Sequence, residues 1–125
     1  MTKSEEKKFY KWMDEVIEKY RKILLLHSYQ IGYKKKDESG HYLSMEFTAP
    51  YRHSCLFYST KFMEQVLDSD TDKDELERRV CHELFHVVTD RFYSLANARV
   101  VSDREIEDER ESLVDHLANI VFNLT

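Results

Sequence analysis

The sequence predicts a single α+β domain over residues 1–125, and three observations lead to this prediction. Apolar residues recur at three- and four-residue steps before about residue 26 and after residue 72, which is typical of amphipathic helices. Between residues 28 and 59 they alternate with polar residues, which is typical of strands. The chain has 2 Gly and 1 Pro, so long disordered segments are not expected. Strands that are separate in sequence from the helices indicate an α+β arrangement.

The first helix is predicted from Ser4 to about Leu26, with Lys and Glu on its outer face. Its inner face is formed by Phe9, Trp12, Met13, Val16, Ile17, Tyr20, Ile23 and Leu24.

Three short strands are predicted next, at residues 28–34, 42–49 and 54–59. The polar stretch 34–40 between the first two is typical of a hairpin loop, and Pro50 ends the second strand. We therefore expect a small three-stranded antiparallel sheet.

Two long helices are predicted to follow. Asp72 with Glu75 three residues later resembles a capping box, and a helix runs from there to about Phe92. Ser102 with Glu105 forms a second such signal and opens a last helix that reaches about Asn123.

The first of these helices contains His82-Glu83-Leu84-Phe85-His86. Two histidines four residues apart lie one turn apart on one helix face, where both can bind one zinc ion. A glutamate between them reaches a metal-bound water, so the pattern predicts metal-assisted hydrolysis of a peptide bond with Glu83 as general base.

A helical projection separates these histidines from the core. With His82 at zero, His86 falls near 40°, whereas the apolar residues fall between roughly 120° and 240°. These apolar residues are Leu76, Val80, Leu84, Val87 and Val88. Histidines that belong to the core are expected among these apolar residues. The projection therefore favours a role for His82 and His86 as metal ligands.

The third ligand is sought on the last helix. An extended motif with Gly at position 89 and His at position 92 is excluded by Thr89 and Phe92. Glu111 and Asp115 lie on one acidic face, roughly 120° or more from the apolar stripe of Ile106, Leu113, Leu117, Ile120 and Leu124. Glu111 can then bind the metal while Asp115 accepts the ring N–H of a ligand histidine. Spacing alone leaves Glu107 and Glu109 open as alternatives.

These residues resemble the gluzincin metallopeptidases, in which a glutamate on the following helix is the third zinc ligand. The run Glu111-Ser-Leu-Val-Asp115-His-Leu-Ala118 is also similar to the ligand helix of small ImmA-like and phage-encoded zinc peptidases. The resemblance covers residues 72–122. It implies a minimal zincin-like fold, a Zn²⁺ cofactor held by His82, His86 and Glu111, and peptide hydrolysis.

Two other classes of function stay open beside a zinc peptidase. One is a zincin-fold regulatory or interaction protein that keeps the metal and cleaves little. The other is a helical interaction protein whose motif is accidental. In the peptidase, the sheet edge at 54–59 is expected to align an extended substrate, and Tyr51, His53, Tyr93 and Arg99 are candidate oxyanion donors.

Composition predicts a cytoplasmic protein, and the motif predicts a protein or peptide substrate as its partner. The net charge is −5, with no basic face for nucleic acid, no apolar run long enough to span a membrane and no signal peptide in Met1–Lys8. Cys55 and Cys81 are expected to be free buried thiols. The alternative for Cys55 is that it closes the metal site from the sheet edge and makes the zinc structural.

Overall fold

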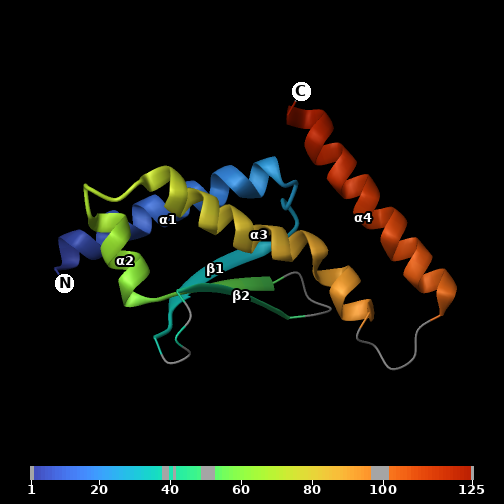
Figure 1. Cartoon of the computed structure of the whole chain (residues 1–125), viewed down its shortest axis with the longest axis horizontal. Helices are drawn as coiled ribbons and strands as arrows, with labels where there is room; N and C mark the ends of the chain where they lie inside the picture. The colour runs from blue at the N-terminus through green and yellow to red at the C-terminus, as the bar shows by residue number, and fades with distance from the viewer. Residues whose placement is uncertain (1, 38–39, 41, 49–52, 97–101, 125) are drawn as a thin grey trace.

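The computed structural model describes residues 2–37, 40, 42–48, 53–96 and 102–124 and has the predicted α+β composition. The elements follow one another as α1 (Lys3–Ile23), β1 (Gln30–Lys35), β2 (Leu43–Thr48), β3 (His53–Tyr58), α2 (Thr60–Leu67), α3 (Lys73–Ala96) and α4 (Asp103–Leu124). Helices α1 and α3 lie on the same side of the sheet (Figure 1). Among these described helices, none is long and apolar enough to cross a membrane.

The sheet is mixed, and the prediction of an antiparallel sheet with a hairpin between the first two strands was wrong. The strand order is β1-β3-β2, with β1 parallel and β2 antiparallel to the central β3. The chain between β1 and β2 passes the end of β3 instead of turning back on β1. There the N–H of Lys36 donates to the carbonyl of Tyr58 (2.8 Å), and the N–H of Ser59 donates to the carbonyl of Tyr42 (3.2 Å). Alternation shows which side chains point inward, but it does not show which strands pair.

Helix α2 is an element that the sequence analysis left unassigned. Ser59 caps it, since its hydroxyl accepts a hydrogen bond from the N–H of Phe62 (3.1 Å). Phe62, Met63 and Val66 are buried, so one face of this short helix belongs to the core. The serine followed by apolar residues at helical spacing is the signal that identifies it.

The core lies between the sheet and the helices. It consists of Phe9, Met13, Val16, Ile17, Leu24, Leu26, Leu56, Tyr58, Phe62, Met63, Val66, Leu76, Val80, Leu84, Val87 and Ile120. Burial of such side chains is the main favourable contribution to folding. Helix α1 supplies the inner face that its sequence predicts, although its cap is Thr2, which forms a capping box with Glu5.

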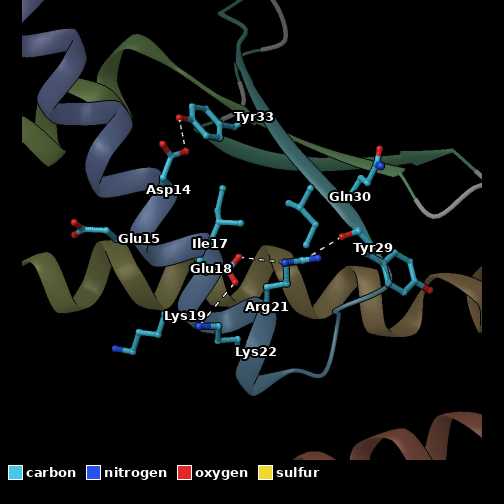
Figure 2. A pocket seen from close by; sticks show the side chains of 11 residues that line it. Asp14, Glu15, Ile17, Glu18, Lys19, Arg21, Lys22, Tyr29, Gln30 and Tyr33 are labelled. Atoms are coloured by element: carbon cyan, nitrogen blue, oxygen red, sulfur yellow. Dashed lines mark hydrogen bonds and ion pairs between the residues drawn. The ribbon is translucent and has the colours of Figure 1, made fainter.

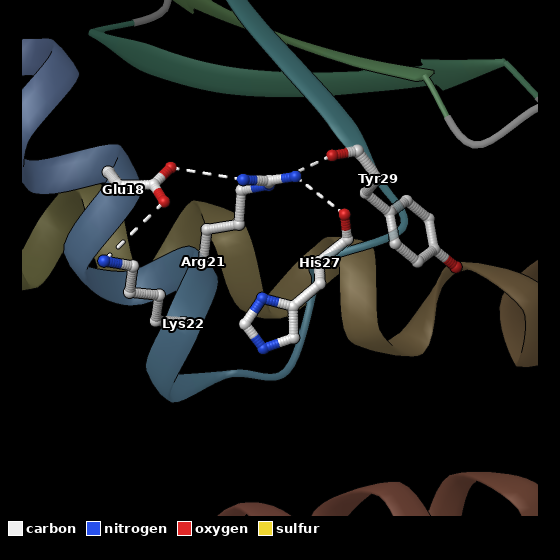
Figure 3. Close-up of polar contacts among 5 residues, drawn as sticks. All are labelled: Glu18, Arg21, Lys22, His27 and Tyr29. Atoms are coloured by element: carbon white, nitrogen blue, oxygen red, sulfur yellow. Dashed lines mark hydrogen bonds and ion pairs between the residues drawn. The ribbon is translucent and has the colours of Figure 1, made fainter.

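Arg21 joins the end of α1 to the start of β1. Its guanidinium donates to the carbonyls of Tyr29 (3.1 Å) and His27 (2.7 Å) and pairs with Glu18 (3.2 Å), as Figure 3 shows. The helix ends at Ile23 with Leu24 as its C-cap, and the next residue, Leu25, has a φ of 58° in the left-handed region. This arrangement fixes where the chain leaves α1, and therefore where β1 enters the sheet.

Helix α4 is attached to the rest of the protein by only part of its apolar surface. Ile120 is buried, Leu113 is half-buried, and the ring Nε2 of His116 donates to the carbonyl of Leu24 (2.7 Å). The predicted stripe is not fully buried, because Ile106, Leu117 and Leu124 remain exposed. The packed face is centred on Leu113 and His116, which turns part of the stripe toward solvent.

Replacing Arg21 by Met is expected to lower the free energy of unfolding by about 2 kcal/mol, since two backbone carbonyls lose a charged donor. The control is Arg110→Met, which removes an exposed pair with Glu107 (2.7 Å). The control is expected to cost less than about 0.5 kcal/mol. Urea unfolding measures both. Equal losses of unfolding free energy in the two variants would show that Arg21 does not stabilise the connection between α1 and β1.

Candidate metal centre

The burial of one face of α3 determines where its polar residues point. Leu76, Val80, Leu84 and Val87 are buried, as the projection predicts, and Val88 is half-buried. The helix begins after Asp72, whose carboxylate accepts from the N–H of Asp74 (3.0 Å). His82 and His86 lie on the side of the helix away from the buried stripe, and both are exposed.

His82, Glu83 and His86 form a compact group on this helix. Their ligand atoms, one from each side chain, all lie within 4.8 Å of one another. The two imidazole rings are 5.2 Å apart between centroids and nearly perpendicular, at 84°. Two imidazole nitrogens and a carboxylate are a donor set that suits Zn²⁺, which binds such atoms at about 2.0–2.2 Å. The two imidazole nitrogens lie close enough to share one ion, with the Glu83 carboxylate beside it, so the residues fit the metal.

The structure does not bring Glu111 and Asp115 to this group. Among the residues that the structure describes, the group of donors contains His82, Glu83 and His86 alone. Glu111 and Asp115 are exposed on α4. Glu111 lies roughly 200° around the helix from Leu113, which belongs to the packed face. The assignment of Glu111 as third ligand therefore stays a prediction, and it requires α4 to turn.

Two other residues near the motif have structural roles. His116 is occupied by its hydrogen bond to Leu24 and attaches α4 to the end of α1. Cys81 is half-buried on α3, where burial raises the pKa of its thiol and the charge of Glu77 adds to the effect. Cys81 lies roughly 100° from His82 around the helix, off the face that carries the two histidines.

Cys55 lies on the wrong side of the sheet to complete the metal site. On β3, Ser54, Leu56 and Tyr58 point toward the helices and are buried, and Cys55 alternates with them. It therefore faces away from α3. Burial raises the pKa of this thiol too. The alternative in which Cys55 makes the zinc structural was wrong.

His53 is the one candidate oxyanion donor whose side chain lies within the described residues. Tyr51, the side chain of Tyr93 and Arg99 lie outside the described residues. His53 is exposed at the start of β3 and lines a cavity with Cys55 and Glu46. Because it shares a face of the sheet with Cys55, it also points away from α3.

A cavity of about 280 Å³ adjoins His82 on the side of β2. His82 and Glu83 line it from α3, and Tyr42 and Leu43 line it from the start of β2. Arg78 and Arg79 complete its wall. The sequence analysis did not identify these four neighbours. The signal for the two arginines is their position one turn before His82, on the same exposed side of the helix.

A larger cavity of about 740 Å³ lies between α1 and β1 and contains no residue of the metal group (Figure 2). Several of its polar side chains bind one another or the backbone. Arg21 binds Glu18 and two carbonyls, and Asp14 accepts from the hydroxyl of Tyr33 (2.8 Å). Burial, and then the hydrogen bond to Asp14, raise the pKa of Tyr33 well above its usual range. These contacts connect α1 to β1 and have a structural role.

Purified protein is expected to bind zinc stoichiometrically, and His82→Ala and His86→Ala are each expected to abolish this binding. Zinc at about 100-fold above its Kd should raise the Tm of the native chain by roughly 8–10 °C. His27→Ala is the control, since His27 is an exposed histidine outside the group. Metal analysis after dialysis and thermal unfolding test this. Zinc retained by both histidine variants would place the metal elsewhere.

In comparisons with known proteins, no family model, no curated protein and no solved structure matched this chain.

Proposed function

We propose that this protein is a zinc-dependent peptidase in which His82 and His86 hold the ion and Glu83 is the general base. One observation carries the proposal: both imidazoles and the Glu83 carboxylate converge within 4.8 Å on the exposed face of a helix whose other face is buried. Such a group combines metal ligands with a proton acceptor at one place.

The proposed reaction is the hydrolysis of a peptide bond. A zinc ion held by the two histidines supplies Lewis-acid chemistry, which lowers the pKa of a water molecule and polarises the scissile carbonyl. A carboxylate oxygen of Glu83 accepts the proton of the attacking water. Glu83 then delivers that proton to the leaving amine nitrogen, so the peptide C–N bond breaks and a carboxyl and an amine form.

The edge strand β2 is the part of the sheet best placed to align an extended substrate. The earlier assignment of this role to residues 54–59 was wrong, because β3 is central and pairs on both sides. Strand β2 has β3 on one side only, packs against α3, and lines the cavity beside His82 through Leu43. A peptide that adds to this edge uses the unpaired backbone groups of β2.

The third ligand proposed is Glu111, with Asp115 accepting the ring N–H of a ligand histidine. The exposed apolar residues of α4 support a turn of this helix. Ile106, Leu117 and Leu124 lie beside the packed face and are exposed. Burying more of this stripe would remove further apolar surface from water. Because this rotation turns Glu111 by only roughly 40°, the helix must also shift as a body for its carboxylate to reach the metal group.

The second candidate is a metal-binding regulatory or interaction protein of the same fold. The position of Glu111 favours it, because two histidines and Glu83 are the only donors that the described residues bring together. With Glu83 as a ligand, no general base remains, and the protein would bind zinc without cleaving peptides.

Glu83→Gln is expected to keep zinc and to lower peptide cleavage by about 100-fold or more, since general-base catalysis typically contributes about 10²–10⁴-fold. The variant keeps the size of the side chain and removes its basicity. Cleavage of a mixed peptide library, read by mass spectrometry, and zinc content are measured together. Loss of zinc in this variant would identify Glu83 as a ligand and favour the second candidate.

Glu111→Ala is expected to weaken zinc binding by at least about tenfold, because a ligand carboxylate is lost. Glu107→Ala and Glu109→Ala are the matched variants from the same acidic stretch and should leave the affinity unchanged. Competition with a chromophoric chelator gives the three dissociation constants. A loss confined to Glu107→Ala or Glu109→Ala would reassign the ligand.

A further inference from the structure

Two arginines stand beside the candidate metal group and have no part in the proposed catalysis. Arg78 and Arg79 line the same cavity as His82 and Glu83. Both guanidinium groups are exposed, at 76% and 52% of the side-chain surface. We call Arg78 and Arg79 the cationic wall. Hydrolysis itself does not require such a pair of arginines within one helical turn of the metal group.

Arg79 is held in place by two neighbours. Its guanidinium lies over the ring of Tyr42, 5.1 Å from the ring centroid, and its Nε is 3.6 Å from a carboxylate oxygen of Glu75. The stacking on Tyr42 orients the charge at the mouth of the cavity. Tyr42 immediately precedes β2, so this contact also ties the cationic wall to the start of the edge strand.

One carboxylate, Glu75, pairs with both arginines beside the metal group. Arg78 also binds Glu75, at 2.8 and 3.0 Å, so one carboxylate serves two guanidinium groups. A second cavity, of about 550 Å³, shares Tyr42 and Arg79 and adds Lys61. Asp37 and Asp72 also line it and keep their negative charge. The arginines therefore attract a carboxylate through short-range charge-assisted hydrogen bonds and not through a net positive charge of the cavity.

The geometry also indicates which part of a substrate meets Arg79. Strand β2 and helix α3 both run from the side of α2 toward the side of α4 (Figure 1). Arg79 precedes the middle of the histidine pair by about 7.5 Å along the helix axis. An extended peptide advances about 3.3 Å per residue, so about two residues cover this distance. A peptide that adds antiparallel to β2, the more stable pairing, passes the histidines first and Arg79 afterwards.

We propose that Arg79, assisted by Arg78, forms a subsite for an acidic side chain of a peptide substrate, about two residues after the cleaved bond. This inference rests on the proposed function for the position of the cleaved bond. The binding of an acidic side chain beside Tyr42 does not depend on cleavage. Charge-assisted hydrogen bonds between guanidinium and carboxylate give the preference.

The test is selection of a randomised hexapeptide library on immobilised, zinc-loaded Glu83→Gln protein. At one position, captured peptides are expected to contain Asp and Glu about three- to fivefold more often than Asn and Gln. An exposed ion pair contributes about enough free energy of binding for this preference. Arg79→Met should remove the enrichment, and Arg79→Glu should replace it by enrichment in Lys and Arg. Arg110→Met, which removes an arginine paired with Glu107 on α4, is the control and should keep it. Salt at about 0.5 M should reduce it.

The outcomes separate this inference from the proposed function. Absence of acidic enrichment, or enrichment that survives Arg79→Met and Arg79→Glu, overturns the subsite. Native protein then cuts the selected peptides, and mass spectrometry locates the bond. If the enriched acidic residue lies before the cleaved bond in the peptide, the proposed position of the subsite is wrong. If the native protein binds no zinc and cuts no peptide, the proposed function fails, while the dependence of the enrichment on Arg79 still decides the subsite.

Discussion

The burial of one stripe of α3 is the constraint on which the rest of the candidate site depends. Leu76, Val80, Leu84 and Val87 fix the rotation of the helix about its axis, because exposing them again would cost roughly 1.5–3 kcal/mol each. With that rotation fixed, His82 and His86 must point to solvent, and the arginines one turn earlier must line the same side. The packing of α3 against β2 then places the group beside a sheet edge.

The two ends of the chain contribute differently to this arrangement. Helix α1 is firmly joined to the sheet, since Arg21 binds the carbonyls that lead into β1. Helix α4 is held through His116 and Ile120, in its C-terminal half, and its acidic face is turned away from α3. The protein therefore places the two histidines and Glu83 through its core. Whether a carboxylate of α4 can reach this group depends on how that helix packs.

The sequence predicted the parts of the fold that follow from periodicity. The three long helices and the three strands lie within a few residues of their predicted bounds, and the face of α3 that carries His82 and His86 is as the projection indicated. The pairing of β1 with β3 was not predictable, because alternation in a strand specifies its buried face and not its neighbours. The assignment of Glu111 stays a prediction, because the apolar stripe of α4 does not determine how the helix packs: Ile106, Leu117 and Leu124 remain exposed.

A crystal structure of the zinc-loaded protein, with anomalous scattering measured at the zinc absorption edge, tests the central claim most directly. Our interpretation predicts an anomalous peak about 2.0–2.1 Å from one ring nitrogen of His82 and of His86. It also predicts that the Glu83 carboxylate lies near the ion without binding it. The ligand that comes from α4 would be visible in the same map. An anomalous peak elsewhere, or none in protein that contains zinc, would contradict the metal site, and a Glu83 carboxylate bound to the ion would contradict its role as general base.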